Sequence, residues 1–193
     1  MISLANLISR DDFVLVIIDI QERLAAAMGR RDRVVRAVTR LARTAAMLGV
    51  PIIVTRQYPQ GLGPTVPELE AALGDLAAAG AEIVGVDKTA FCCAAEVDFS
   101  EALSMTERTQ VVLVGMETHI CVAQTALALV AEDYEVHVPA DACCSREDAA
   151  HEVALDRLRF SGVAVTTSES VMYEAVGRAG TDEFRQLLAI VKE

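Results

Sequence analysis

The chain has 193 residues, 53% of them hydrophobic and 23% charged, a composition that indicates one globular domain and argues against disorder. Its net charge of −11 argues against nucleic acid or an anionic membrane as partners, because both would repel it. Residues 1–10 lack the pattern of a signal peptide, and no apolar run reaches the ~18–20 residues that span a bilayer. We therefore expect a soluble, cytoplasmic protein.

Apolar runs typical of buried strands alternate with segments of helical periodicity. Strands are expected at 13–18, 51–55, 82–86, 110–114, 135–138 and 163–165. Helices are expected at 31–48, 67 to about 73, 99–105, 120–132, 145–160, 169–176 and 182–192. Gly49 suits a helix C′ position, Pro67 the first position of a helix, and Ser145 a helix N-cap. Residues 57–67 and 141–146 are expected to form loops.

This alternation, with short connections, predicts an α/β fold. We expect a Rossmann-like three-layer α-β-α sandwich with a mainly parallel six-stranded sheet, in a single domain over residues 1–193. Ligands of such sheets bind beyond the carboxyl ends of the strands. Asp19, Lys88 and the segment before Cys121 lie at those ends, so three potentially reactive side chains are expected to meet at one edge.

Cys121 lies where strand 110–114 is followed by helix 120–132. A thiol at a helix N-terminus faces unpaired N–H groups and the positive end of the helix dipole, so its thiolate is favoured. Cys121 is therefore a candidate nucleophile. The other four of the five cysteines form two adjacent pairs, Cys92–Cys93 and Cys143–Cys144, without C-x-x-C spacing. We expect them to be reduced and mostly buried, rather than disulfide-bonded or zinc-binding.

Three motifs in combination resemble the Asp/Lys/Cys triad of the isochorismatase-like cysteine hydrolases. They are Asp19 in Ile-Ile-Asp-Ile-Gln, Lys88 in Asp-Lys-Thr-Ala-Phe, and Cys121 in Gly-Met-Glu-Thr-His-Ile-Cys-Val. The resemblance covers nearly the whole chain. A finer similarity, to the isochorismatase-domain-containing subgroup, lies in Gly61-Leu-Gly-Pro-Thr-Val-Pro-Glu68, Ser145-Arg146 and Thr166-Thr-Ser-Glu-Ser170.

The resemblance implies hydrolysis through a covalent intermediate on Cys121, which would attack a carbonyl or similar electrophilic carbon. Asp19 would take the thiol proton and return it to the leaving group. Lys88 would hold the Asp19 carboxylate and help to keep the thiolate charged. A cis peptide bond is implied between Met116 and Glu117. The backbone N–H groups of Glu117 and Cys121 would form an oxyanion hole.

The expected substrate is a small molecule with an amide-like or related C–N bond, held in a small and partly apolar pocket. Positions beside the three motifs give the candidates for substrate binding: Gln21, Leu24, Tyr58, Phe91, Thr118 and Ile120. For Gln21, a supporting role for the first loop and a plain surface position remain open. The resemblance also implies a homo-oligomer, a dimer or larger.

Two departures from relatives narrow the activity. Nicotinamidases of this superfamily bind a metal through an Asp and histidines after the second strand, but residues 55–60 contain neither. The three histidines have no paired ligand spacing, so we expect no metal and no other cofactor. True isochorismatases lack the cysteine at the position of Cys121, which argues against isochorismate as substrate. We expect His119 to make structural hydrogen bonds rather than to act as the base.

Two other classes of function remain open from the sequence. The chain could be a binding or scaffold protein that keeps the triad geometry without important turnover. It could also be a thiol redox protein that uses Cys121 with Cys92 or Cys93. The same redox question applies to Cys143 and Cys144, for which buried, inert thiols are the simpler expectation.

Overall fold

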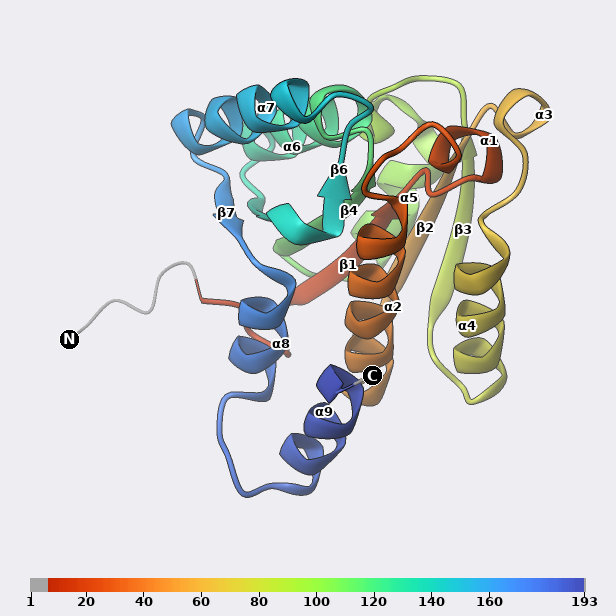
Figure 1. The fold of residues 1–193 in the computed structure, drawn as a ribbon. Coiled ribbons are helices and arrows are strands. Elements are labelled where there is room, and N and C mark those ends of the chain that lie inside the picture. The colour runs from red at the N-terminus through yellow and green to blue at the C-terminus, as the bar shows by residue number, and fades with distance from the viewer. Residues whose placement is uncertain (1–6, 193) are drawn as a thin grey trace.

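The computed structural model describes residues 7–192 and has a parallel sheet between two layers of helices (Figure 1). Six strands follow the order β3-β2-β1-β4-β5-β7, and every pairing within the described sheet is parallel. Their bounds are β1 Phe13–Ile18, β2 Ile52–Gln57, β3 Ile83–Lys88, β4 Gln110–Met116, β5 Glu135–Pro139 and β7 Ala164–Thr166. The predicted three-layer α/β fold is therefore confirmed.

The sheet contains a seventh strand that the sequence did not indicate. The two-residue strand β6, Cys143–Cys144, pairs with the end of β4 through Gly115 and Met116. Residues 141–146 were expected to form a loop, and six strands were expected in all. Two residues are too short to show a period-2 pattern, so only the pairing reveals this strand.

The helices divide into two layers. Their bounds are α1 Glu22–Ala25, α2 Arg31–Met47, α3 Pro59–Leu62, α4 Pro67–Ala78, α5 Val97–Met105, α6 Ala123–Ala131, α7 Asp148–Phe160, α8 Ser168–Val176 and α9 Asp182–Lys192. One core cluster joins the sheet to α2, α4, α8 and α9, and the other joins it to α5, α6 and α7. Alternate residues of β1 face the two clusters, as expected for a strand covered on both sides.

Two predicted helices begin differently from the prediction. The helix expected from Ser145 begins at Asp148 with Glu147 as its N-cap, so the cap assignment for Ser145 was wrong. The helix expected from residue 120 is preceded by a π-helical turn, Thr118–Val122, and α6 follows it. The short helices α1 and α3 lie in segments without clear periodicity, and α4 extends to Ala78 rather than ending near residue 73.

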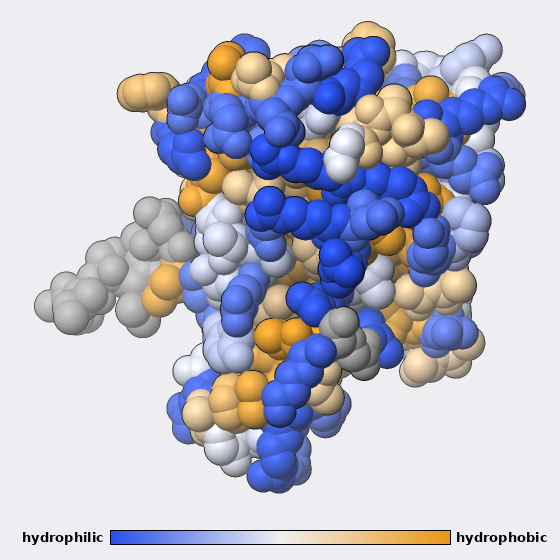
Figure 2. Space-filling view, in the orientation of Figure 1, coloured by the Kyte–Doolittle hydropathy of each residue, from blue (hydrophilic) through white to orange (hydrophobic). Residues whose placement is uncertain are grey.

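The surface is mostly hydrophilic on the face drawn in Figure 2, where charged residues of the sequence are exposed. Hydrophilic side chains cover most of the face seen in Figure 2, which carries α2 and α8 in the orientation of Figure 1. Within residues 7–192, no helix is both long and apolar enough to cross a bilayer.

At the carboxyl edge of the sheet, β1 and β4 approach each other closely. Gly115 pairs with Ile18 and has a φ of +125°, a conformation that favours glycine. A Cβ atom at position 115 would lie 2.0 Å from the Ile18 carbonyl oxygen, so the close approach requires a glycine. Asp19 follows directly, and residues 118–122 follow the end of β4.

Candidate active site

Three strand ends bring Asp19, Lys88 and Cys121 together. Asp19 follows β1, Lys88 ends β3, and Cys121 lies in the π-helical turn after β4. Lys88 Nζ lies 2.7 Å from Asp19 Oδ2 and 3.7 Å from Cys121 Sγ. The side chains of Asp19 and Lys88 are 0% exposed, and Cys121 is 5% exposed. The sequence placed these residues at one edge, and the structure places them in contact.

The Lys88 ammonium lies among oxygen atoms. Besides Asp19, it donates to Gln57 Oε1 at 2.6 Å and lies 3.2 Å from the carbonyl oxygen of Ala90 and 3.4 Å from that of Phe91. Burial is the largest single influence and would lower the pKa of Lys88, but Asp19, Cys93 and Cys121 together outweigh it, so the pKa is raised. Lys88 is therefore a permanent positive charge beside the thiol.

The resting Cys121 thiol is protonated, contrary to the expectation from its helix N-terminus. Burial, followed by the negative charge of Asp19, raises its pKa to about 12, and Lys88 only partly opposes this. A hydrogen bond between the thiol and Asp19 acts in the same direction as burial. Desolvation of a nearly buried thiol and the adjacent carboxylate together exceed the favourable charges. A nucleophilic thiolate would form only as its proton moves to Asp19.

The turn before Cys121 is held in place by the side chain and the backbone of Glu117. The Met116–Glu117 peptide bond is cis. The buried Glu117 carboxylate accepts hydrogen bonds from the backbone N–H of Arg146 at 2.9 Å and from its Nε at 3.1 Å. The Glu117 carbonyl accepts from the N–H groups of Ile120 and Val122. Glu117 was predicted to act only through its backbone N–H, so this anchoring by the carboxylate was missed.

The side chains of residues 118 and 119 are engaged in structural contacts. Thr118 Oγ1 lies 2.8 Å from Nδ1 of the buried His151, so this hydroxyl has a partner within the fold. His119 Nδ1 lies 2.8 Å from Ser145 Oγ. This contact is the structural hydrogen bond expected of His119. Ser145 is not the cap of α7, because its hydroxyl contacts His119 and the helix begins three residues later, at Asp148.

Gln21 supports the first loop, one of the roles left open by the sequence. Its buried amide accepts from the Gln57 N–H at 2.8 Å and donates to the carbonyl oxygens of Gln57 at 3.0 Å and Gly63 at 2.7 Å. These bonds tie the end of β2 to the loop before α4. Its carbonyl and both of its N–H donors are engaged by the backbone rather than left for a substrate.

The apolar candidates for substrate binding divide into two groups. Leu24 and Ile120 are half-buried and pack against the two different core clusters. Tyr58 and Phe91 are each 55% exposed. The N–H of Tyr58 donates to the Lys88 carbonyl at 2.8 Å, and the carbonyl oxygen of Phe91 faces the Lys88 ammonium. Tyr58 and Phe91 are therefore exposed aromatic residues whose backbones contact Lys88 at the end of β3.

All five cysteines are free. Cys93, Cys143 and Cys144 are buried, in agreement with the expected reduced thiols, whereas Cys92 is half-buried. Burial raises the pKa of Cys93 to about 11 and that of Cys144 to about 12. These thiols are therefore protonated near neutral pH, as is expected of inert cysteines.

Thr55 and Gln57 belong to the site but were not singled out from the sequence. Thr55 Oγ1 donates to Asp19 Oδ1 at 2.8 Å, and Gln57 Oε1 accepts from Lys88. In the sequence, residues 55–60 stood out only for their lack of Asp and His as metal ligands. The signal was the alternation of polar residues at positions i and i+2 where a buried strand ends. In the part of the chain that the structure describes, no group of three or more His, Cys, Asp or Glu residues could hold a metal ion.

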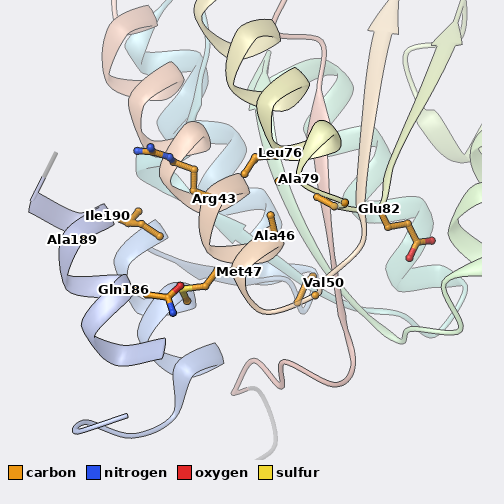
Figure 3. A pocket seen from close by; sticks show the side chains of 13 residues that line it. Arg43, Ala46, Met47, Val50, Leu76, Ala79, Glu82, Gln186, Ala189 and Ile190 are labelled. Carbon is orange, nitrogen blue, oxygen red and sulfur yellow. The ribbon is translucent and has the colours of Figure 1, made fainter. Parts of the chain in front are cut away.

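A hollow lies at the opposite edge of the sheet. A pocket of about 660 Å³ is enclosed by α2, α4 and α9 and by residues just before β2 and β3. Figure 3 shows Arg43, Met47, Leu76, Gln186 and Ile190 around it. None of the residues predicted for the active site contributes to its lining.

Comparison of the sequence with known protein families agrees with the fold and with the cluster at the strand ends. The isochorismatase domain model matches residues 13–170, so the chain belongs to the isochorismatase family. Isochorismatase domain-containing protein 2 of Xenopus laevis is 36% identical over 180 residues, covering 93% of this chain and 83% of the relative. The family resemblance stated from the sequence motifs is therefore confirmed.

Solved structures show the same architecture. The structure of MAR1 ribonuclease from Caenorhabditis elegans superposes with a TM-score of 0.87 at 32% identity, covering 96% of this chain and 92% of the other. The YcaC gene product of Escherichia coli, described as an octameric hydrolase of unknown specificity, gives a TM-score of 0.81 at 24% identity. It covers 96% of this chain and 90% of its own, and at this identity it shows the shared fold alone.

Proposed function

We propose that the chain is a cysteine hydrolase that cleaves a small amide-like or related C–N substrate through a covalent Cys121 intermediate, without a metal. The observation that carries this proposal is the buried cluster of thiol, carboxylate and ammonium formed by Cys121, Asp19 and Lys88. Desolvating charged groups is costly, and such perturbed clusters concentrate at functional sites. Membership of the isochorismatase family supports the same chemistry.

The first half-reaction would acylate Cys121. As Sγ attacks the carbonyl carbon of the substrate, the thiol proton moves to the Asp19 carboxylate and the carbonyl oxygen becomes negatively charged. The backbone N–H groups of Glu117 and Cys121 would stabilise this oxygen. When the C–N bond breaks, Asp19 returns the proton to the leaving nitrogen and a thioester remains.

The second half-reaction would restore the thiol. Asp19 takes a proton from a water molecule as the water oxygen attacks the thioester carbon. The C–S bond breaks, the carboxylic acid product leaves, and the proton on Asp19 returns to Sγ. Lys88 neither gains nor loses a proton in this cycle. Its charge stabilises the transient thiolate and orients the carboxylate, consistent with its raised pKa.

The exposed aromatic pair Tyr58 and Phe91 is proposed to border the entrance for the substrate. Both join the Lys88 strand end through backbone contacts, and both expose 55% of their surface. Leu24 and Ile120 are proposed as further apolar lining. We also propose that the chain acts as a homo-oligomer, supported by the octamer described for the Escherichia coli neighbour. A cytoplasmic location is proposed from its five free thiols.

The name of the Caenorhabditis elegans neighbour raises ribonuclease activity as a second candidate. The net charge of −11 argues against it, because a polyanion would be repelled from the chain. An RNA substrate incubated with wild type and Cys121→Ala separates the candidates. RNA cleavage that is lost in Cys121→Ala would replace amide hydrolysis as the proposed reaction.

The decisive experiment is a screen of small amides, ureides and esters with wild type and Cys121→Ala. We expect turnover of at least one substrate class, and a loss of about a thousandfold or more in Cys121→Ala. Cys92→Ala is the matched control, because Cys92 is half-buried and lies outside the cluster. A covalent adduct on Cys121, detected by intact-mass measurement, would support the intermediate. Equal turnover by wild type and Cys121→Ala would contradict the proposal, and reversible disulfide formation without turnover would favour the redox alternative.

A further inference from the structure

The Asp19–Lys88 ion pair crosses a strand that supplies neither residue. β2 lies between β1 and β3 in the sheet, Asp19 follows β1, and Lys88 ends β3. Thr55 and Gln57 are two residues apart at the carboxyl end of β2, so their side chains lie on the same face. Thr55 donates to Asp19 Oδ1 at 2.8 Å, and Gln57 accepts from Lys88 Nζ at 2.6 Å.

We infer that Thr55 and Gln57 are positioning residues that hold the carboxylate and the ammonium in their reactive arrangement beside Cys121. This inference rests on the proposed hydrolase function. The polarity of each partner is matched to its charge: a hydroxyl donor serves the anion, and an amide oxygen serves the cation. Both partners are neutral, so they fix the pair without changing the charge of the site.

The orientation of the Gln57 amide is determined by its other contacts. Its Nε2 donates to the carbonyl oxygen of Thr89 at 2.7 Å, so Oε1 must face the Lys88 ammonium. The backbone N–H and carbonyl of Gln57 are both bonded to the buried Gln21 amide, which also reaches Gly63. Gln57 is therefore held by its backbone and its side chain, as a positioning role requires.

The contacts of Gln57 also set the direction of the ammonium. An ammonium has three protons, and the two shortest contacts of Lys88 Nζ are to Gln57 and Asp19. The remaining side of Nζ faces the carbonyl oxygens of Ala90 and Phe91 and, at 3.7 Å, Cys121 Sγ. Because the amide is neutral, the charge of Lys88 is available to a thiolate at Sγ.

The test measures the rate at which iodoacetamide alkylates Cys121 between pH 6 and 10, followed by peptide mass spectrometry on the full chain. The titratable groups that face this thiol are Asp19 after β1, Lys88 on β3 and Cys93. Gln57→Glu keeps the shape, adds a negative charge beside Lys88 and removes the Nε2 donor to the Thr89 carbonyl. We expect alkylation to be about tenfold slower at a given pH, equivalent to about one unit in the pH profile.

Two further variants and a control complete the design. Gln57→Met and Thr55→Val remove the polar contacts at similar volume, and each is expected to slow alkylation by about tenfold. Gln186→Glu makes the same charge change on an exposed residue of α9, at the other edge of the sheet, and is expected to leave the profile unchanged. Thermal unfolding of each variant identifies any that fails to fold. The isosteric Gln57→Glu decides the test if Gln57→Met is unstable.

The inference is overturned if the Gln57 and Thr55 variants follow the wild-type profile while Lys88→Met departs from it. A lower melting temperature with an unchanged profile would likewise show a purely structural role and overturn it. Neither result affects the proposed hydrolase function, which fails separately if turnover does not depend on Cys121. Once a substrate is known, a loss in kcat larger than the change in KM supports the positioning role.

Discussion

The two edges of the sheet contrast sharply. At the carboxyl edge, buried polar and charged side chains pack around Lys88 with contacts as short as 2.6 Å. At the amino edge, α2, α4 and α9 surround a pocket of about 660 Å³ lined by Ala46, Met47, Val50, Leu76, Ala189 and Ile190 among others (Figure 3). The pocket at the amino edge has space, and the cluster at the carboxyl edge has the reactive groups. Under the proposed function, the chemistry of converging strand ends is a better guide to the active site than volume.

Removing the buried cation should have the largest effect and tests the special status of the carboxyl edge. Lys88→Met leaves the buried Asp19 carboxylate without its ionic partner, so we expect a loss of about 3–5 kcal/mol in the free energy of unfolding. Urea unfolding followed by circular dichroism measures it. Arg159→Met, which breaks the exposed pair with Asp156, is the control and should cost no more than about 1 kcal/mol. Equal losses in both variants would contradict the contrast between buried and exposed pairs.

Acidification should have a smaller effect, concentrated on two buried histidines. Burial lowers the pKa of His137 and of His151, the partner of Thr118 at the carboxyl edge. The unfolded chain therefore binds protons more readily, and stability should fall as the pH drops below about 6.5, the ordinary histidine pKa.

The free energy of unfolding measured from pH 7.5 to pH 5 checks this dependence. His151→Asn keeps an amide near the position of Nδ1 but cannot titrate, so its stability should fall less steeply over the same range. Parallel slopes for wild type and His151→Asn would show that His151 does not contribute.

Filling the pocket at the amino edge should have the smallest effect on catalysis. Ala189 lies on α9 and lines the pocket. If the substrate binds at the carboxyl edge, Ala189→Leu should leave Cys121-dependent turnover and Cys121 alkylation within about twofold of wild type, since surface changes away from a site are usually near neutral. A large loss of turnover with an intact fold would move the substrate site to the amino edge and reverse the comparison.

The elements with strong periodicity could be predicted from the sequence. β1 and α2 lie close to their expected bounds because one is a continuous apolar run and the other has a regular apolar face. β6 and the π-helical turn at Thr118–Val122 could not be predicted, because each depends on a partner far away in the chain or on the path out of β4. The prediction of Ser145 as a helix N-cap was wrong, because its hydroxyl forms a hydrogen bond with His119 instead.

The sequence by itself determined the α/β class, the family motifs and the three strand ends that carry Asp19, Lys88 and Cys121. These follow from local periodicity and from the rule that parallel strands share one carboxyl edge. Only the tertiary structure decided the charge state of the thiol, because burial and the neighbouring carboxylate outweigh its helix-terminal position. It alone also decided that β2 supplies Thr55 and Gln57 to the ion pair, since strand order is set by packing rather than by sequence order.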